Sequence, residues 1–191
     1  GAENYNYTSG STANSTDLGK RNRVSASAAA GRNITNLLTN HSFESSGSWT
    51  SSYWENSSYN TSTNTAVISS DDSYLGTKSI KVNVPTPATV DGGYCMYQDV
   101  ALTAGATYTL SGYIKTSGVT VRDGATTGGA TLAMSLVKAD GKERVYSNKV
   151  DGTTESSIDS GWQRITLTFE VPSNVTSSRV ALVLYNASGT A

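Results

Sequence analysis

Hydrophobic and polar residues alternate along most of the chain after residue 35, which is the pattern of half-buried β-strands. In Ser79–Val84, the residues Ile80, Val82 and Val84 share one face, and Pro85 ends the run. Further runs that we interpret as strands occupy residues 65–69, 94–102, 108–115, 131–138, 143–150, 163–171 and 179–185. The pattern therefore predicts a succession of short strands.

The segments between these runs carry turn signals, such as Ala104-Gly105 and Asp140-Gly141. No helical period is sustained anywhere in the sequence. About eight or nine strands separated by turns indicate an all-β fold, an antiparallel β-sandwich. Each strand has one apolar face for a shared core and one polar face that points outward, so one of the outer faces is free to bind a ligand.

The first part of the chain differs from the rest. Residues 1–33 lack periodicity and are interpreted as a polar lead-in or linker, with at most one short strand near Tyr5. Residues 34–191 are predicted to form the sandwich. We place its first strand at Phe43-Glu44 and expect a polar loop rich in aromatic rings directly after it.

Composition narrows the classes of partner. Charged residues make up 15% of the 191 residues and the formal net charge is −1, so nothing favours nucleic acid or an anionic membrane surface. No run is apolar and long enough to insert into a membrane. Cys95 is the only cysteine, which excludes an intrachain disulfide and fits a bacterial surface protein better than a secreted eukaryotic domain.

Catalytic groups do not gather into a recognisable motif. His41, the only histidine, lies in a turn of the opening segment, and Cys95 lies within a predicted strand as a small packed residue. The adjacent carboxylates Asp71-Asp72 are interpreted as a solvated turn. We therefore predict that the chain is not an enzyme, and a hydrolase is only a distant third hypothesis.

Four motifs, in order, carry a resemblance to a known family. They are LLTNHSFE at residues 37–44, LGTKSIKV at 75–82, QDVALTAGATYTLS at 98–111, and GWQR at 161–164. Together they resemble the jelly-roll carbohydrate-binding modules of the CBM 4/9 type, which are galactose-binding-like β-sandwiches. The resemblance spans residues 35–191. It implies a jelly-roll fold and a non-catalytic module that binds a polysaccharide or glycan.

The resemblance also implies a setting and a metal. Such a module would belong to a larger secreted or surface-attached bacterial protein, and its other partners would be the further domains of that protein. The family's structural calcium often uses the opening Phe-Glu together with an acidic final strand. Here the sequence stops at Gly189-Thr190-Ala191, so Glu44 is the single metal ligand that the resemblance implies.

Aromatic and polar residues on outward positions are the candidate ligand-binding groups, because sugars stack on rings and hydrogen-bond to polar side chains. Alternation places Tyr94 and Tyr97 on opposite faces of one strand, so at most one of them can face a ligand. The candidate residues are Trp49, Tyr53, Trp54, Tyr97, Tyr113, Lys115 and Tyr146.

An alternative without sugar binding also fits the sequence. The same sandwich can serve as a structural or adhesive spacer of a bacterial cell-surface protein, in which case the rings cap the core. The richness in Ser, Thr and Asn and the linker-like start are compatible with this role.

Overall fold

The computed structural model describes residues 36–150 and 158–191. The chain divides into two units, Gly1–Asn36 and Leu37–Ala191, and the description below concerns the second unit. The predicted lead-in at residues 1–33, with its short strand near Tyr5, lies outside the described residues.

Almost all regular structure in the described part of the chain is β-strand. A single short 3-10 helix, η1 (Ser57–Tyr59), follows the first strand. The strands are β1 (Thr50–Trp54), β2 (Thr65–Ser69), β3 (Ser79–Val84), β4 (Gly93–Asp99), β5 (Thr107–Val121), β6 (Gly129–Lys138), β7 (Gly141–Tyr146), β8 (Ile158–Glu170), β9 (Val175–Tyr185) and β10 (Ala187–Thr190). The predicted all-β class is therefore confirmed.

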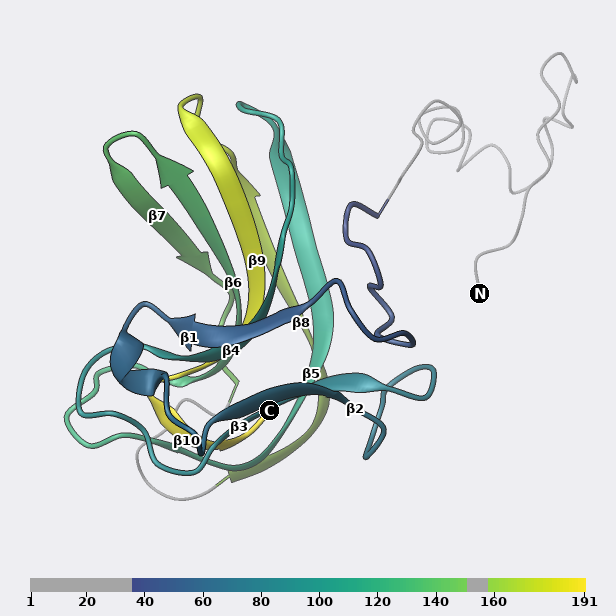
Figure 1. The fold of residues 1–191 in the computed structure, drawn as a ribbon, viewed down its shortest axis with the longest axis vertical. Coiled ribbons are helices and arrows are strands. Elements are labelled where there is room, and N and C mark those ends of the chain that lie inside the picture. The colour runs from purple at the N-terminus through teal and green to yellow at the C-terminus, as the bar shows by residue number, and fades with distance from the viewer. Residues whose placement is uncertain (1–35, 151–157) are drawn as a thin grey trace, which may run out of the picture. The chain divides into compact units, whose positions relative to one another are not determined.

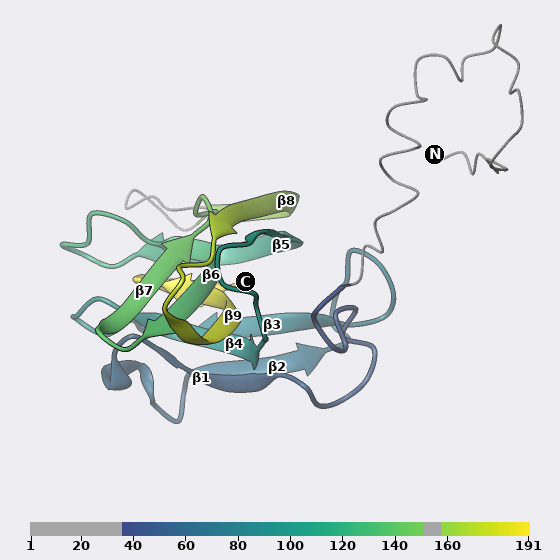
Figure 2. The same ribbon diagram turned by 90° about the horizontal axis from the view of Figure 1, so that it is seen from above.

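These strands form two five-stranded antiparallel sheets, which are the layers of a β-sandwich (Figures 1 and 2). Sheet A has the order β1-β4-β9-β6-β7, and sheet B has the order β2-β3-β10-β5-β8. Across sheet A the strand direction changes from nearly horizontal at β1 to steep at β7 in Figure 1. This rotation is the ordinary twist of a sheet, and it gives sheet A a curved outer face.

The core lies between the sheets and follows the alternation in the sequence. Ile80, Val82 and Val84 of β3 are buried, as the pattern predicts. On the opposite layer, Leu132, Met134 and Leu136 of β6 point inward and pack in the same interior. Removal of these aliphatic side chains from water is the main source of stability in such a sandwich.

The opening segment departs from the prediction. No strand forms at Phe43-Glu44, and the first strand of the sandwich is β1. Asn40 and Phe43 have positive φ angles of 46° and 63°, which no strand contains. The Asn40 side-chain amide donates to the carbonyl oxygens of Ser45 and Gly47 at 2.7 and 3.2 Å, and these bonds fix the segment as a turn.

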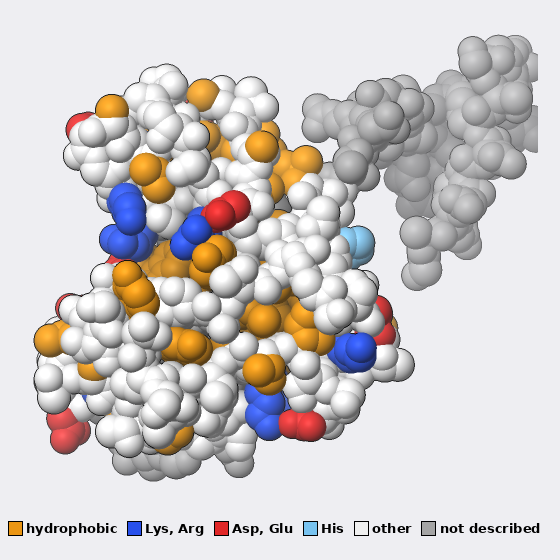
Figure 3. Space-filling model, in the orientation of Figure 1, with side chains coloured by type: hydrophobic (Ala, Val, Ile, Leu, Met, Phe, Trp, Pro, Cys, Tyr) orange, Lys and Arg blue, Asp and Glu red, His pale blue; other side chains and the backbone are white. Residues whose placement is uncertain are grey.

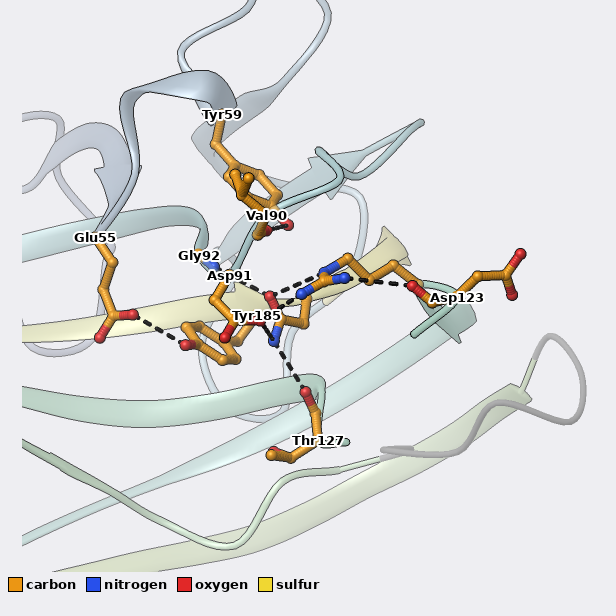
Figure 4. Close-up of polar contacts among 10 residues, drawn as sticks. Glu55, Tyr59, Val90, Asp91, Gly92, Asp123, Thr127 and Tyr185 are labelled. Carbon is orange, nitrogen blue, oxygen red and sulfur yellow. Dashed lines mark hydrogen bonds and ion pairs between the residues drawn. The ribbon is translucent and has the colours of Figure 1, made fainter. Parts of the chain in front are cut away.

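The last strand was also missing from the sequence prediction, which ended at Tyr185. The chain crosses from sheet A to sheet B at Asn186, which is buried and has a φ of 47°. β10 then lies between β3 and β5. Asn186 Nδ2 donates to Asp91 Oδ1 at 2.9 Å and to the Thr127 carbonyl at 3.1 Å, and its Oδ1 accepts from the Gly92 N–H at 3.0 Å (Figure 4). These hydrogen bonds of the Asn186 side-chain amide hold the backbone where it crosses between the sheets.

Within residues 36–150 and 158–191, no helix has both the length and the apolar character needed to cross a membrane.

Candidate functional site

The outer face of sheet A has a floor of small side chains. Strand register aligns the outward residues of its inner strands side by side, for example Cys95 with Val183 and Ala133 with Ala181. The outward residues of this floor are Gly93, Cys95, Gly129, Thr131, Ala133, Ala181 and Val183. Because none of them is large, the bulky residues at the edges of the face rise above the floor.

Four aromatic residues stand on or beside this floor: Trp54, Tyr97, Tyr146 and Tyr185. We call this outer surface of sheet A, with its four rings, the aromatic face. The rings come from the four strands β1, β4, β7 and β9, so no single stretch of sequence contains them. Aromatic rings beside small residues are the arrangement that accepts the flat face of a sugar ring.

Trp54 is the anchor at one end of the aromatic face. Only 4% of its surface is exposed, and its Nε1 donates a hydrogen bond of 3.0 Å to the Tyr146 hydroxyl. The Arg144 guanidinium lies 6.0 Å from the Trp54 ring centroid. The indole is therefore held in place by contacts with β7, the other edge of the sheet.

Glu55 ties these groups together. Its carboxylate accepts hydrogen bonds from the hydroxyls of Tyr146 and Tyr185, the latter at 2.9 Å, and pairs with Arg144 Nε at 3.3 Å. Glu55 has a φ of 68°, a strained conformation for a residue other than glycine. Figure 4 shows Glu55 reaching toward Tyr185, next to the locked crossing described above.

The electrostatics of this end favour neutral phenols. Burial, and then the hydrogen bond to Glu55, raises the pKa values of Tyr146 and Tyr185 well above the usual 10.0. The Lys149 ammonium lies 5.1 and 5.5 Å from the centroids of these two rings, and burial lowers its pKa. The end is thus a polar network in which both hydroxyls keep their protons at physiological pH.

The other end of the aromatic face is built around Tyr97. The Arg179 guanidinium lies 3.6 Å from its ring centroid, and Arg179 Nε contacts Asp99 Oδ1 at 2.7 Å. The hydrogen bond to Asp99 raises the pKa of Arg179, although burial opposes that rise. Beside Tyr97 lies a depression of about 430 Å³, lined by Leu37, Thr39, Ser48, Thr50, Tyr97, Gln98 and Asp99.

The surface view shows the same arrangement. In Figure 3, hydrophobic side chains lie at the bottom of a hollow across the middle of the molecule, and Lys or Arg side chains stand beside it. The aromatic face thus combines apolar surface with hydrogen-bonding groups at its rim.

A comparison with protein families gives a match to the model CBM_4_9, described as a carbohydrate binding domain, over residues 35–189. The chain belongs to this family. It is a carbohydrate-binding module, as the order of motifs in the sequence predicted. A comparison with curated proteins found no match.

Solved structures similar to the module include three from bacterial proteins. The CBM22-1 xylan-binding domain of Paenibacillus barcinonensis Xyn10C has 14% identity and a TM-score of 0.47, covering 78% of this chain and 87% of its own. The C-terminal family 22 module of Clostridium thermocellum Xyn10B has 18% identity and a TM-score of 0.45, with coverages of 78% and 89%. The CBM22-1–CBM22-2 tandem of Xyn10C has 16% identity and a TM-score of 0.49, with coverages of 81% and 43%. The family assignment rests on the sequence match.

The structure brings three of the predicted binding residues of the module together. Trp54, Tyr97 and Tyr146 share the aromatic face. The fourth ring, Tyr185, is a further candidate that the sequence also indicates, and it alternates with Val183 and Ala181 along β9. The sequence did not point to the polar groups of the rim, which are Glu55, Arg144, Lys149, Asp99 and Arg179.

The prediction of a polar loop rich in aromatic rings after Phe43-Glu44 is wrong, because most of these residues lie in β1 and η1 or pack against the core. Trp49 precedes β1, packs between the two sheets, and donates from Nε1 to the Asn40 carbonyl at 3.1 Å. Tyr53 and Trp54 belong to β1, and Tyr59 is fully buried in η1. Tyr53 alternates with Trp54 and therefore points away from the aromatic face. Trp49 is thus a core cap and not a ring presented to solvent.

Tyr113 and Lys115 do not join the aromatic face either. Both lie on β5, at exposed positions on the outer side of sheet B, as their alternation with the buried Ile114 predicts. Of the predicted binding residues, three therefore lie on the outer face of sheet A and two on that of sheet B, whereas Trp49 and Tyr53 lie on neither.

Glu44, the predicted calcium ligand, is surrounded by hydrogen-bond donors. Its carboxylate accepts from the Thr77 N–H at 2.7 Å, the Thr77 hydroxyl at 2.5 Å and the Lys78 N–H at 3.2 Å. These bonds, chiefly that from the Thr77 hydroxyl, lower its pKa. Calcium needs several converging oxygen ligands, and the described residues offer no group of three acidic, His or Cys side chains. Calcium at Glu44 therefore stays a prediction.

Cys95 lies on β4, Asp71 and Asp72 lie in the loop after β2, and His41 lies before β1. Cys95 is fully buried in the floor of the aromatic face, and burial raises the pKa of its thiol to about 12. Asp71 and Asp72, predicted as a solvated turn, form ion pairs with Lys81 and Lys115 at 2.7 and 2.5 Å. His41 lies in the opening turn and is exposed.

Proposed function

We propose that the module binds a neutral polysaccharide chain along the aromatic face of sheet A, and that it acts by binding alone, without catalysis. The observation that supports this proposal is the set of three half-buried rings, Tyr97, Tyr146 and Tyr185, which stand on the floor of small residues. Sugar rings are flat and have apolar C–H faces, so they can stack on the exposed parts of these rings while their hydroxyls reach the rim.

The polar groups of the rim supply the hydrogen-bond partners. Asp99 and Arg179 form an exposed pair at one end, and Glu55 and Arg144 form a pair at the other. Each end therefore presents one carboxylate and one guanidinium, and Lys149 adds a cation at the Glu55 end. The hydroxyls of a neutral sugar can donate to the carboxylates and accept from the cations. Weak binding at a single module would be strengthened where several modules meet one polymer.

The setting is part of the proposal. We infer that the module belongs to a secreted or cell-surface bacterial protein, and that its other domains act on or attach to the same polymer. Family membership supports this inference, because such modules are attached to larger extracellular proteins.

Affinity electrophoresis and calorimetry with the purified chain test the proposal. The panel consists of xylan, which is the ligand named for the P. barcinonensis domain above, together with mixed-linkage β-glucan, mannan and soluble cellulose derivatives. We expect binding to at least one polymer. Tyr97→Ala should weaken that binding about tenfold, because the ring and its Arg179 contact are lost.

Tyr53→Ala is the matched control, because Tyr53 is an exposed ring of the same sheet that points away from the aromatic face. It should leave the affinity unchanged. A chain that is folded but binds none of the polymers contradicts the proposed function. Equal losses in Tyr97→Ala and Tyr53→Ala contradict the assignment to the aromatic face.

A further inference from the structure

The outer face of sheet B carries a second group of rings. Tyr74 lies in the loop between β2 and β3, Tyr113 on β5 and Trp162 on β8. The Tyr74 and Tyr113 rings are stacked, with centroids 3.6 Å apart and an interplanar angle of 14°. Trp162 lies 6.2 Å from Tyr74 at an angle of 58°. We call these three rings the ring platform.

The ring platform is exposed. Tyr74 and Tyr113 keep 46% and 41% of their surface in contact with solvent, and Trp162 is half-buried. It lies on the other layer of the sandwich from the aromatic face, so the two surfaces share no residue. Large rings that gather on an exposed surface indicate a binding site more often than rings scattered singly.

Ion pairs hold the loop that carries Tyr74. Asp71 pairs with Lys81 of β3 at 2.7 Å, and Asp72 pairs with Lys115 of β5 at 2.5 Å. The loop therefore bridges two strands of sheet B that β10 separates. Tyr74 is thus positioned over β5 before any ligand arrives, which lowers the entropy cost of binding.

Internal hydrogen bonds make the same loop rigid. The Ser79 hydroxyl donates to the Asp72 carbonyl at 2.8 Å, and the Ser73 hydroxyl donates to the Gly76 carbonyl at 3.0 Å. The Glu44 carboxylate binds the N–H groups of Thr77 and Lys78 from outside the loop. A preformed, rigid site of this kind is typical of small-ligand recognition.

Hydrogen-bonding groups lie at the edge of the rings. Asp72 has a lowered pKa because it accepts hydrogen bonds, first from Lys115, and the Trp162 side chain adds a further one. Its carboxylate is thus ionised, half-exposed and in contact with Lys115 and Trp162. A ring surface with one carboxylate and one ammonium beside it matches the chemistry of a pyranose, which has an apolar face and a hydroxyl rim.

From this geometry we propose that the ring platform is a second carbohydrate-binding site, which takes a neutral pyranose unit of a polysaccharide on the exposed rings of Tyr74 and Tyr113. Asp72 and Lys115 are the hydrogen-bonding partners of its hydroxyls. Because this site and the aromatic face lie on opposite layers, one module can contact two segments of polymer at once, which raises its apparent affinity for a dense matrix.

The test uses the full chain, labelled with ¹⁵N, and records amide chemical shifts during titration with xylohexaose, cellohexaose and mannohexaose. The Tyr97→Ala background weakens the aromatic face, so the ring platform can be followed by itself. We expect one of these oligosaccharides to shift the amides around Tyr74, Tyr113 and Trp162. Tyr74→Ala should weaken this binding about tenfold.

Leu75→Ala is the matched control, since Leu75 is the neighbouring apolar residue and is 77% exposed. It should leave the platform titration unchanged. The proposal is overturned if no oligosaccharide shifts the platform amides, or if Tyr74→Ala and Leu75→Ala behave alike. Shifts confined to the aromatic face would overturn the second site and leave the proposed function standing. In the native chain, shifts confined to the platform would support the second site and contradict the aromatic face.

Discussion

Both outer faces of the sandwich carry aromatic residues, but the rings are more buried on sheet A and more exposed on sheet B. On sheet A, Trp54 is 4% exposed, and its ring is held over small neighbours by one hydrogen bond and by the Arg144 guanidinium. On sheet B, Tyr74 and Tyr113 stack on each other in the open. A buried ring contributes to stability and to shape, whereas an exposed ring contributes mainly contact area for a partner.

This difference follows from what lies beneath the rings. Five of the seven floor residues of sheet A are glycine, alanine or cysteine, so the rings of Trp54 and Tyr146 can pack close to the sheet. On sheet B, the outward positions of β5 and β8 carry threonines, such as the hydrogen-bonded pair Thr109 and Thr168 at 2.9 Å. These branched side chains fill the surface. Tyr113 on this face is therefore 41% exposed.

Among substitutions that compare the two faces, Trp54→Ala should change the stability of the fold the most. We expect it to lower the free energy of unfolding by about 3–5 kcal/mol, because a buried indole leaves a cavity and removes the partner of the Tyr146 hydroxyl. Urea denaturation measures this loss. Trp54→Phe should recover part of the stability, and a loss below about 1 kcal/mol for Trp54→Ala would show that the ring is not enclosed.

Removing a tyrosine hydroxyl should cost more stability on the aromatic face than on the ring platform. Tyr146→Phe removes a hydroxyl that connects Trp54 to Glu55, and we expect a cost of about 1–2 kcal/mol because their partly buried polar atoms lose a partner. Tyr113→Phe, on the exposed face, should change stability by less than about 0.5 kcal/mol. Parallel urea titrations compare the two variants. Equal losses would contradict the distinction between a closed and an open face.

Trp162→Ala provides the counterpart of the first substitution. Because Trp162 is half-buried at the edge of the ring platform, we expect a loss of about 1 kcal/mol, well below that of Trp54→Ala. The same denaturation assay applies. If Trp162→Ala costs as much as Trp54→Ala, the ring platform is a structural cluster that supports sheet B.

The smallest effect concerns acid stability next to the ring platform. Folding lowers the pKa of Glu44 below its usual 4.5, so its contribution to stability is present above that pH and is lost as the pH falls through the folded-state value. Glu44→Gln removes this contribution. We expect the difference in melting temperature between the native chain and Glu44→Gln to shrink as the pH falls below 4.5. A difference that stays constant would contradict the lowered pKa.

Much of the scaffold could be predicted from alternation. The bounds of β2 and β3 agree with the predicted runs, and Tyr94 and Tyr97 do face opposite sides of β4. β10 escaped prediction because four small and polar residues carry no periodic signal. The error at Phe43 has a clear cause, since left-handed backbone stabilised by the Asn40 amide is not visible in hydrophobicity.

The site was harder to predict than the scaffold. Tyr146 and Trp54 are neighbours only because the order β1-β4-β9-β6-β7 brings the two edge strands around one curved face. Alternation shows that a side chain points outward, but it does not show which outward face is lined by small residues. Tyr74 lies in a loop without a pattern, and only its contact with Tyr113 gives it a role.

The rate at which Cys95 is alkylated can report how often the aromatic face opens. Cys95 is the only thiol in the chain, it is fully buried beneath the rings, and its pKa of about 12 keeps it unreactive at neutral pH. An alkylating reagent can reach it only when this part of sheet A opens. The rate of labelling therefore measures how often the aromatic face opens locally. A bound sugar should slow that rate in proportion to the fraction of modules that it occupies.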